Sequence, residues 1–319
     1  MPAMTAPDSI TGSITWAAYA WIPITIWAAA CQTVRTGLQK HLKGRLSTNG
    51  ASFTRFLYGM PLALLYLAAV AYISGLAVPA PNRDFILWLA VGAAFQIFAT
   101  NLLIVALNLH NFVVGTAYAK TEAIQAAIFG LLLLGETVSI GGLVAIVMGT
   151  VGVMLISLKN SDDKLRAFLL GWTERSALIG IASGGLFAIS AVGFRAASLS
   201  LDTDNMPLAA GTTLAWATVS QTIAMAIWLA WREKGQIGKV LAAWRPGMMV
   251  GLTSAAGSAG WFTAMAMQVA AYVRMLGLVE MAFTFLMSYL VFRERPARAE
   301  IIGVAVLLCG ILLGLFVRK

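Results

Sequence analysis

Two glutamates lie inside long apolar stretches of this 319-residue sequence. Glu122 belongs to the segment TEAIQAAIFGLLLLGE (121–136), and Glu280 belongs to VEMAFTFLMSYLVFRE (279–294). An ionisable group at the depth of a lipid bilayer costs at least about 2.5 to 3.5 kcal/mol on insertion scales, so its default interpretation is functional. The two carboxylates could bind an amine or take up a proton. The alternative is a structural hydrogen bond between helices.

Further polar side chains surround Glu122. Tyr118, Glu122 and Gln125 are spaced i, i+4 and i+7, so they share one face of a helix. Lys120 is about 200° around the helix from Glu122 and cannot join that face. We therefore expect Lys120 either to face another part of a cavity or to pair with a neighbouring helix.

Arginines occur inside or beside the apolar stretches. Arg35 and Arg195 are binding candidates because a guanidinium holds carboxylates or phosphates in bidentate fashion, which favours anionic or zwitterionic ligands. We expect Arg35 with Arg55 near one mouth of the molecule, and Arg195 with Arg274 near the other. For Arg55 and Arg274 we favour snorkelling to the lipid headgroups.

Uncharged polar and aromatic residues complete the candidate set. Asn101 lies in the third apolar stretch, and Ser254, Ser258 and Trp261 follow one another at i, i+4 and i+7 in the eighth. Small residues at that spacing let helices approach closely, so we assign the serines to packing. Trp261 is assigned to a cavity wall.

The elements that position these residues are membrane-spanning helices. The sequence is 60% hydrophobic and 11% charged, with a mean hydropathy of +0.83, whereas soluble domains carry roughly 25% charged residues. A spanning helix needs about 20 mainly apolar residues. The predicted fold is an all-α integral membrane protein with ten transmembrane helices. Their expected ranges are 14–36, 52–74, 85–108, 112–134, 139–158, 176–198, 207–231, 246–267, 272–292 and 299–317.

The two halves of the sequence resemble each other. Sliding the second half back by 158 positions places Glu280 on Glu122, and a slide of 160 places Arg195 on Arg35. Because each half has an odd number of spans, the second half is expected to be inverted relative to the first, around a central cavity. The organisation is an N-terminal tail (1–13), a first five-helix repeat (14–160), a linker (161–175) and a second five-helix repeat (176–319).

The charges are distributed unevenly between the predicted loops. Basic residues cluster after the first, fifth, seventh and ninth helices, whereas the loop after the second helix holds only Arg83. The positive-inside rule then makes the basic loops cytoplasmic and puts both termini on the non-cytoplasmic side of the inner membrane. The net charge of +9 is spread over short clusters and forms no single patch, which argues against nucleic-acid binding.

Several functional classes find no support in the sequence. Cys31 and Cys309 lie in apolar stretches and form neither a disulfide framework nor a metal motif. His41 and His110 lie in or near loops, without a cluster of metal-ligand spacing, and no Walker-type phosphate loop is visible. We therefore predict no cofactor and no enzymatic activity.

The end of each half carries a recognisable pattern, in which an apolar helix closes in Glu and is followed by a Gly-rich helix. LLLLGETVSIGGLVAIVMGTVGVML and SYLVFRERPARAEIIGVAVLLCGILLGL resemble the two EamA repeats of the drug/metabolite transporter superfamily. The resemblance implies a cavity lined mainly by helices one, three, four, six, eight and nine, and alternating access. Many relatives are drawn with cytoplasmic termini and a basic loop after helix two, a pattern from which this sequence departs.

The sequence thus predicts a secondary transporter that exports a small amphipathic or zwitterionic metabolite, such as an amino acid, driven by protons or by exchange. An exporter of cationic lipophilic compounds is the alternative, and a membrane-embedded lipid-modifying enzyme is the alternative of another class. The expected partners are a small-molecule substrate and the lipid bilayer, and the chain could act as a monomer or a homodimer.

Overall fold

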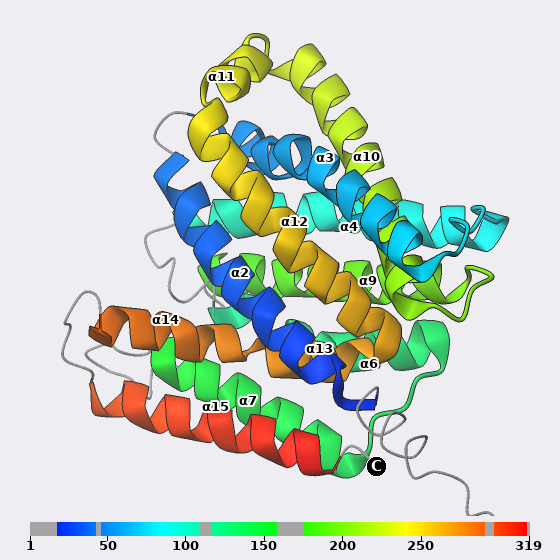
Figure 1. Ribbon diagram of the computed structural model, residues 1–319. Helices are drawn as coiled ribbons and strands as arrows, with labels where there is room; N and C mark the ends of the chain where they lie inside the picture. The colour runs from blue at the N-terminus through cyan, green and yellow to red at the C-terminus, as the bar shows by residue number, and fades with distance from the viewer. Residues whose placement is uncertain (1–17, 43–45, 109–116, 158–174, 291–296, 318–319) are drawn as a thin grey trace, which may run out of the picture.

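The computed structural model describes residues 18–42, 46–108, 117–157, 175–290 and 297–317, and throughout these ranges the regular structure is helical (Figure 1). The predicted N-terminal tail (1–13), nearly all of the predicted linker (161–174) and residue His110 lie outside the described residues. The all-helical character expected from the composition is confirmed for the part that the structure describes.

Within the described residues, each predicted span contains helix. The first half contains α2 (Trp21–Leu42), α3 (Thr48–Ser74), α4 (Arg83–Asn108), α6 (Glu122–Leu134) and α7 (Ile140–Ser157). The second half contains α9 (Arg175–Leu199), α10 (Met206–Arg232), α11 (Gln236–Ala242), α12 (Trp244–Met267), α13 (Ala270–Gly277), α14 (Val279–Leu290) and α15 (Arg298–Phe316). Within the described residues, six helices are long and apolar enough to cross a membrane, so the count of ten spans stays a prediction.

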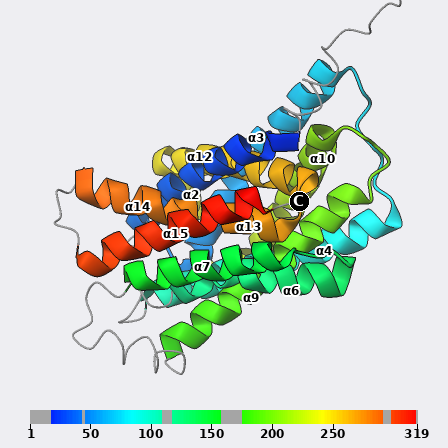
Figure 2. The same cartoon turned by 90° about the horizontal axis from the view of Figure 1, so that it is seen from below.

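The helices pair across the two halves of the chain. α2 packs against α12, and α4 packs against α9, so each of these pairs becomes the other when the halves are exchanged. α3 packs against α10, and α7 packs against α15 (Figures 1 and 2). This interleaving is the arrangement expected of two related repeats that share one interior.

Glycines bring the paired helices into close contact. A Cβ at Gly152 of α7 would lie 2.5 Å from the backbone nitrogen of Leu307 in α15, and one at Gly310 would lie 2.7 Å from the nitrogen of Gly149. Ser190 of α9 donates to the carbonyl of Gly92 in α4 at 2.8 Å. Without a hydrophobic driving force between helices in lipid, such close packing and interhelical hydrogen bonds hold the bundle together.

Polar contacts tie the connections together at two ends of the bundle. At one end, Ser47 and Asn49 each donate to Glu233, both at 2.5 Å. At the other end, Asn82 donates to the carbonyl of Ser200. The connections after α2 and α10 therefore share one end, as the predicted alternation of spans requires.

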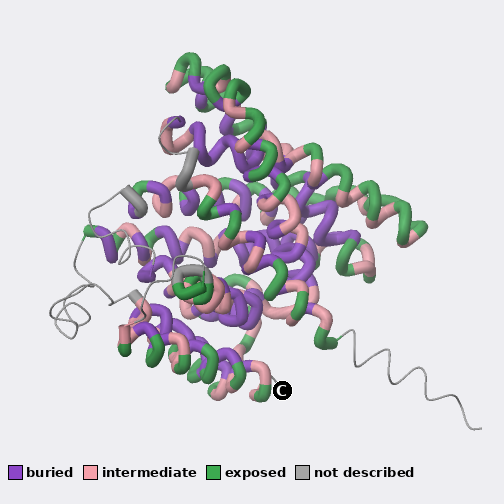
Figure 3. The backbone as a smooth tube through the Cα atoms, turned by 60° about the vertical axis from the view of Figure 1, so that its left-hand side comes forward, coloured by how far each residue is buried: buried purple, intermediate pink, exposed green. Residues whose placement is uncertain are grey.

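The outer surface of the bundle is largely apolar. Large hydrophobic side chains are exposed on its helices, among them Leu65, Ile73, Ile140 and Phe316. Buried and exposed positions alternate along the helices (Figure 3). Such a surface suits a lipid solvent, in which apolar side chains face the acyl chains.

The first helix differs from its prediction in a way that matters for Arg35. The predicted span ended at residue 36, but α2 continues through the polar sequence TGLQKHL to Leu42. Hydropathy marks where apolar residues end, not where backbone hydrogen bonding ends. Arg35 therefore lies inside the helix and is buried, rather than at a helix end.

Candidate functional site

Both helices that carry an intramembrane glutamate are interrupted directly before it. A short helical segment at 117–119 is followed by a turn at Lys120 and Thr121, and α6 begins at Glu122. In the second half, α13 ends at Gly277, and α14 begins at Val279 with Glu280 in its first turn. Ala117–Leu134 still qualifies as a candidate span. At both places, however, tight turns of the i to i+3 type replace helical hydrogen bonds, so the spans predicted at 112–134 and 272–292 each contain a local break that the sequence did not indicate.

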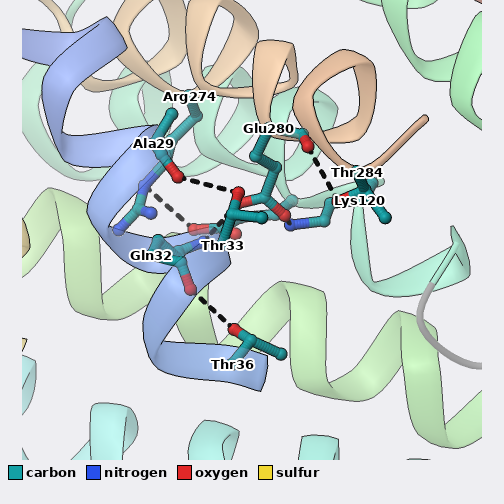
Figure 4. Close-up of polar contacts among 9 residues, drawn as sticks. Ala29, Gln32, Thr33, Thr36, Lys120, Arg274, Glu280 and Thr284 are labelled. Carbon is teal, nitrogen blue, oxygen red and sulfur yellow. Dashed lines mark hydrogen bonds and ion pairs between the residues drawn. The ribbon is translucent and has the colours of Figure 1, made fainter. Parts of the chain in front are cut away.

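Glu280 of α14 contacts both α2 and the turn that precedes α6, one through each of its carboxylate oxygens. Lys120 forms an ion pair with one oxygen, and Gln32 of α2 donates to the other at 2.6 Å (Figure 4). Lys120 thus pairs with a neighbouring helix, which is one of the two outcomes expected from the sequence. Gln32 was not among the predicted site residues because an uncharged amide at this depth gives no strong signal on its own.

Glu122 faces a different cation. The Nε atom of Arg274 lies 2.9 Å from Oε1 of Glu122, although the two groups are not aligned for a hydrogen bond, so the contact is an ion pair. The guanidinium of Arg274 also lies over the ring of Trp261, 4.9 Å from its centroid. The expected snorkelling of Arg274 to the headgroups is wrong, because the glutamate and the indole ring hold this side chain inside the bundle.

These four charged side chains surround one pocket, which we call the ion-pair pocket. Its lining residues are Gln32, Lys120, Glu122, Ala123, Trp261, Arg274, Gly277, Leu278 and Glu280. The pocket contains two acids and two bases, so its net formal charge is zero. Its free interior accommodates about one water molecule, because the paired side chains fill most of the space.

Tyr118 and Gln125 lie away from the ion-pair pocket. Tyr118 packs in a small buried cluster with Met154 and Ala177. Gln125 donates to the hydroxyl of Thr121 at 2.8 Å and to the carbonyl of Ile181 in α9 at 3.2 Å. The predicted common face of Tyr118, Glu122 and Gln125 assumed an unbroken helix, and the turn at residues 120–121 removes that assumption.

Arg195 of α9 donates hydrogen bonds to the end of α12. Its Nε donates to Glu136 at 2.5 Å, and its Nη1 donates to the carbonyls of Met265 and Gln268, the latter at 2.9 Å. These contacts fix the end of α12 to the segment that follows α6. Arg195 and Arg274 therefore pair with different glutamates, Glu136 and Glu122.

The remaining candidates differ in their surroundings. Arg35 and Arg55 are both 8% exposed, so the expected snorkelling of Arg55 is wrong. The Nε and Nη1 atoms of Arg35 have no hydrogen-bond partner among the described residues, and the same holds for the side-chain oxygen of Asn101. Asn101 lines neither the ion-pair pocket nor the pocket that contains Arg55.

Paired charges inside a bundle of apolar helices, placed where two helices are interrupted, are typical of a membrane transport protein. Residues 12–158 and 175–316 match the model of the EamA-like transporter family, and the chain belongs to that family. The resemblance inferred from the two Glu-ending helices is thereby confirmed.

Solved structures support the fold. In total, 29 chains of known structure match this one. One of them, titled "Crystal structure of protein", covers 94% of this chain and 99% of its own length, with a TM-score of 0.66 and 14% sequence identity. No curated protein sequence matches the chain.

Proposed function

We propose that the chain is a secondary transporter of the cytoplasmic membrane that exports a small amphipathic or zwitterionic metabolite, such as an amino acid, by alternating access. The observation that carries this proposal is the ion-pair pocket, in which two acids and two bases neutralise one another at the interrupted helices. A zwitterion brings one charge of each sign, so it can replace one partner in each pair, and the displaced Lys120 and Glu122 carry opposite charges that then compensate each other.

The energetics favour exchange of partners over simple addition of a ligand. A buried charge that loses its partner costs about 3 to 5 kcal/mol, so a ligand must supply the partner that it displaces. An ammonium group can take the place of Lys120 at Glu280, while a carboxylate takes the place of Glu122 at Arg274. Because these contacts join α2, α6, α13 and α14, exchanging them also changes what holds the helices together.

The cationic lipophilic alternative fits the pocket less well. Such a ligand needs an acid that is free to receive it, but Glu122 and Glu280 are both paired with a cation. It also needs an open aromatic face, and the guanidinium of Arg274 lies over Trp261. A cation would therefore have to displace a protein cation without offering the displaced residue a new partner.

Coupling to protons and coupling by exchange both use the same glutamates. Protonation of Glu280 would remove the charge that holds Lys120, and a returning substrate would restore the pairing by supplying a carboxylate. A pH gradient imposed across proteoliposomes separates the two modes, because only proton coupling lets the gradient drive accumulation in the absence of substrate on the opposite side.

The experiment that tests the substrate class is counterflow in proteoliposomes with zwitterionic amino acids and with lipophilic organic cations. We expect saturable counterflow of a zwitterion, and we expect Arg274→Gln and Glu122→Gln each to reduce it strongly. Lys234→Gln, at an exposed position after α10, is the matched control and should leave it intact. If counterflow of an organic cation is lost in Glu122→Gln but unchanged in Arg274→Gln, the proposal is refuted and export of cationic lipophilic compounds is favoured.

For the orientation, we propose that the end containing Ser47, Asn49 and Glu233 is cytoplasmic, with both termini on the other side. This end also carries Arg232, Lys234, Lys239 and Arg245, in keeping with the positive-inside rule. Cleavage of a C-terminal tag by protease added to spheroplasts tests it, and a tag protected until lysis would reverse the assignment. The ion-pair pocket lies within one chain, so a monomer suffices for it.

A further inference from the structure

A second pocket lies on the other side of α12 from the ion-pair pocket, between α3, α4, α10 and α12. We call it the Arg55 pocket, and its polar lining includes Arg55, Gln96, Thr218, Gln221, Ser254 and Ser258. Trp261 lines the ion-pair pocket, whereas its neighbour Phe262 lines the Arg55 pocket, so α12 separates the two. We propose that the Arg55 pocket binds a compact oxyanion, namely a carboxylate or phosphate group.

The first observation is an uncompensated buried cation. Arg55 is 8% exposed and forms no ion pair with any described residue; its one recorded partner is the ring of Phe56, 5.4 Å away. Among the described residues, the charged neighbours that influence Arg55 are Arg35 and Arg274, which are also cations. A buried charge without an opposite charge is strongly unfavourable, which points to an anion from outside the chain.

The second observation is a wall that offers hydrogen-bond donors and no acid. The hydroxyl of Ser254, a residue that is 3% exposed, has no partner among the described residues. Gln221 donates to the side-chain oxygen of Gln96 at 2.9 Å, which leaves the amide nitrogen of Gln96 as a further donor. A guanidinium together with neutral donors forms the chemistry that recognises an oxyanion.

A third observation places Arg35 at the same level of the bundle. α2 and α12 run side by side with Ala28 against Gly260 and Cys31 against Gly257. One further turn along this antiparallel register brings Arg35 level with Thr253, which directly precedes Ser254. The Nε and Nη1 atoms of Arg35 have no hydrogen-bond partner in the described structure, so a second underused guanidinium adds positive potential behind the pocket.

The size of the pocket limits its ligand. Its free interior holds about one water molecule, so one oxygen of an oxyanion can enter directly, whereas the rest of a carboxylate or phosphate group must displace the lining side chains. The lining serines, which the sequence reading assigned to packing, then become part of a binding site. The proposal concerns binding by the purified protein and does not depend on which substrate the ion-pair pocket carries.

The test is the thermal midpoint of delipidated protein in detergent, titrated with sodium acetate or sodium phosphate at constant ionic strength. We expect a saturable rise in the wild type, at least tenfold weaker apparent affinity in Arg55→Gln, and full retention in Arg245→Gln, a matched change at a position outside the pocket. Because high concentrations of such salts stabilise proteins generally, only the saturable part that distinguishes the variants counts.

A second readout separates binding from misfolding. Without anion, Arg55→Gln should melt no lower than the wild type, because the change removes a charge that lacks a partner. Ser254→Ala should keep the fold and weaken acetate or phosphate binding by about twofold to tenfold, a free-energy change of about 0.4 to 1.4 kcal/mol. An anion response that survives both changes would overturn the proposal, as would a wild type that shows no saturable response to either salt.

The same assay distinguishes a soluble anion from a lipid headgroup. Vesicle-free titration with a short-chain phosphatidylglycerol provides the second arm. A shift that depends on Arg55 with acetate or phosphate supports a soluble oxyanion. A shift that depends on Arg55 with the lipid alone would overturn that assignment. Since binding needs no transport, a failure of the transporter proposal leaves this result unaffected, and the reverse also holds.

Discussion

Arg195 and Arg274 each face a glutamate inside the bundle, yet their surroundings differ. Arg195 donates from Nε to Glu136 at 2.5 Å and from Nη1 to carbonyls at the end of α12, so two of its three guanidinium nitrogens donate to protein groups. Arg274 lies 2.9 Å from Glu122 without hydrogen-bond alignment, beside a pocket and over an indole ring.

This difference separates a structural arginine from one available to a ligand. A guanidinium whose donors are mostly satisfied gains little from a new partner, whereas one with misaligned or unused donors gains more. By the same criterion, Arg35 and Arg55 belong with Arg274, although the internal repeat of the sequence relates Arg35 to Arg195. Symmetry in sequence therefore does not imply the same role for both members of a pair.

The largest expected effect concerns the contacts that Arg195 makes with Glu136 and with the end of α12. Arg195→Gln leaves Glu136 as a buried charge without its cation and removes donors from the end of α12, so we expect a loss of about 3 to 5 kcal/mol of stability. Thermal or denaturant unfolding in detergent measures it. Arg175→Gln, an exposed position at the start of the same helix, is the control and should change stability by about 0.5 kcal/mol or less. If Arg195→Gln and Arg175→Gln lower the stability equally, Arg195 is not a structural arginine.

The next effect concerns transport rather than stability. Arg274→Gln should lower transport by about a hundredfold, since removing one partner of a buried charge pair costs about 2 to 5 kcal/mol in binding. Its loss of stability should be smaller than that of Arg195→Gln, because its contact with Glu122 is poorly aligned. Substrate flux and unfolding measured on the same preparations check this ordering, and a reversed order would contradict it.

The packing beside Arg274 gives a smaller effect. A Cβ at Gly277 would lie 2.4 Å from the ring of Trp261, so Gly277→Ala must displace the indole that lies under Arg274. Overpacking of this kind costs about 1 to 3 kcal/mol. We expect lower stability and altered tryptophan fluorescence. Gly238→Ala, where a Cβ meets nothing within 4 Å, should show neither change, and an unchanged Gly277→Ala spectrum would contradict the placement of Trp261.

The smallest effect concerns Gln125, which the sequence alone assigned to the site. Its amide donates to Thr121 and Ile181, and it packs where α9 has Gly184 and Gly185. Gln125→Leu should therefore cost about 1 kcal/mol of stability, the usual net value of a hydrogen bond, and preserve transport. Flux assays beside unfolding curves check it, and a loss of transport at unchanged stability would return Gln125 to the ligand site.

Composition and hydropathy were enough to predict a membrane environment and the approximate positions of the helices. Sixty per cent hydrophobic composition and runs of about 20 apolar residues are sufficient to predict helices in lipid, because unsatisfied backbone groups are so costly there. The depth of Glu122 and Glu280 was also readable, since an acid in an apolar run stands out. The structure brings both acids to one pocket.

The contacts between side chains of different helices could not be predicted from the sequence. The turns before Glu122 and Glu280 change the direction of Tyr118 and Lys120, and helical periodicity cannot anticipate an interruption. Arg195 has a structural role because it donates to backbone carbonyls at the end of α12. Arg274 is a pocket residue because it lies over the ring of Trp261 beside the ion-pair pocket. Periodicity describes one helix at a time, whereas the partner of a buried charge is chosen by packing between helices.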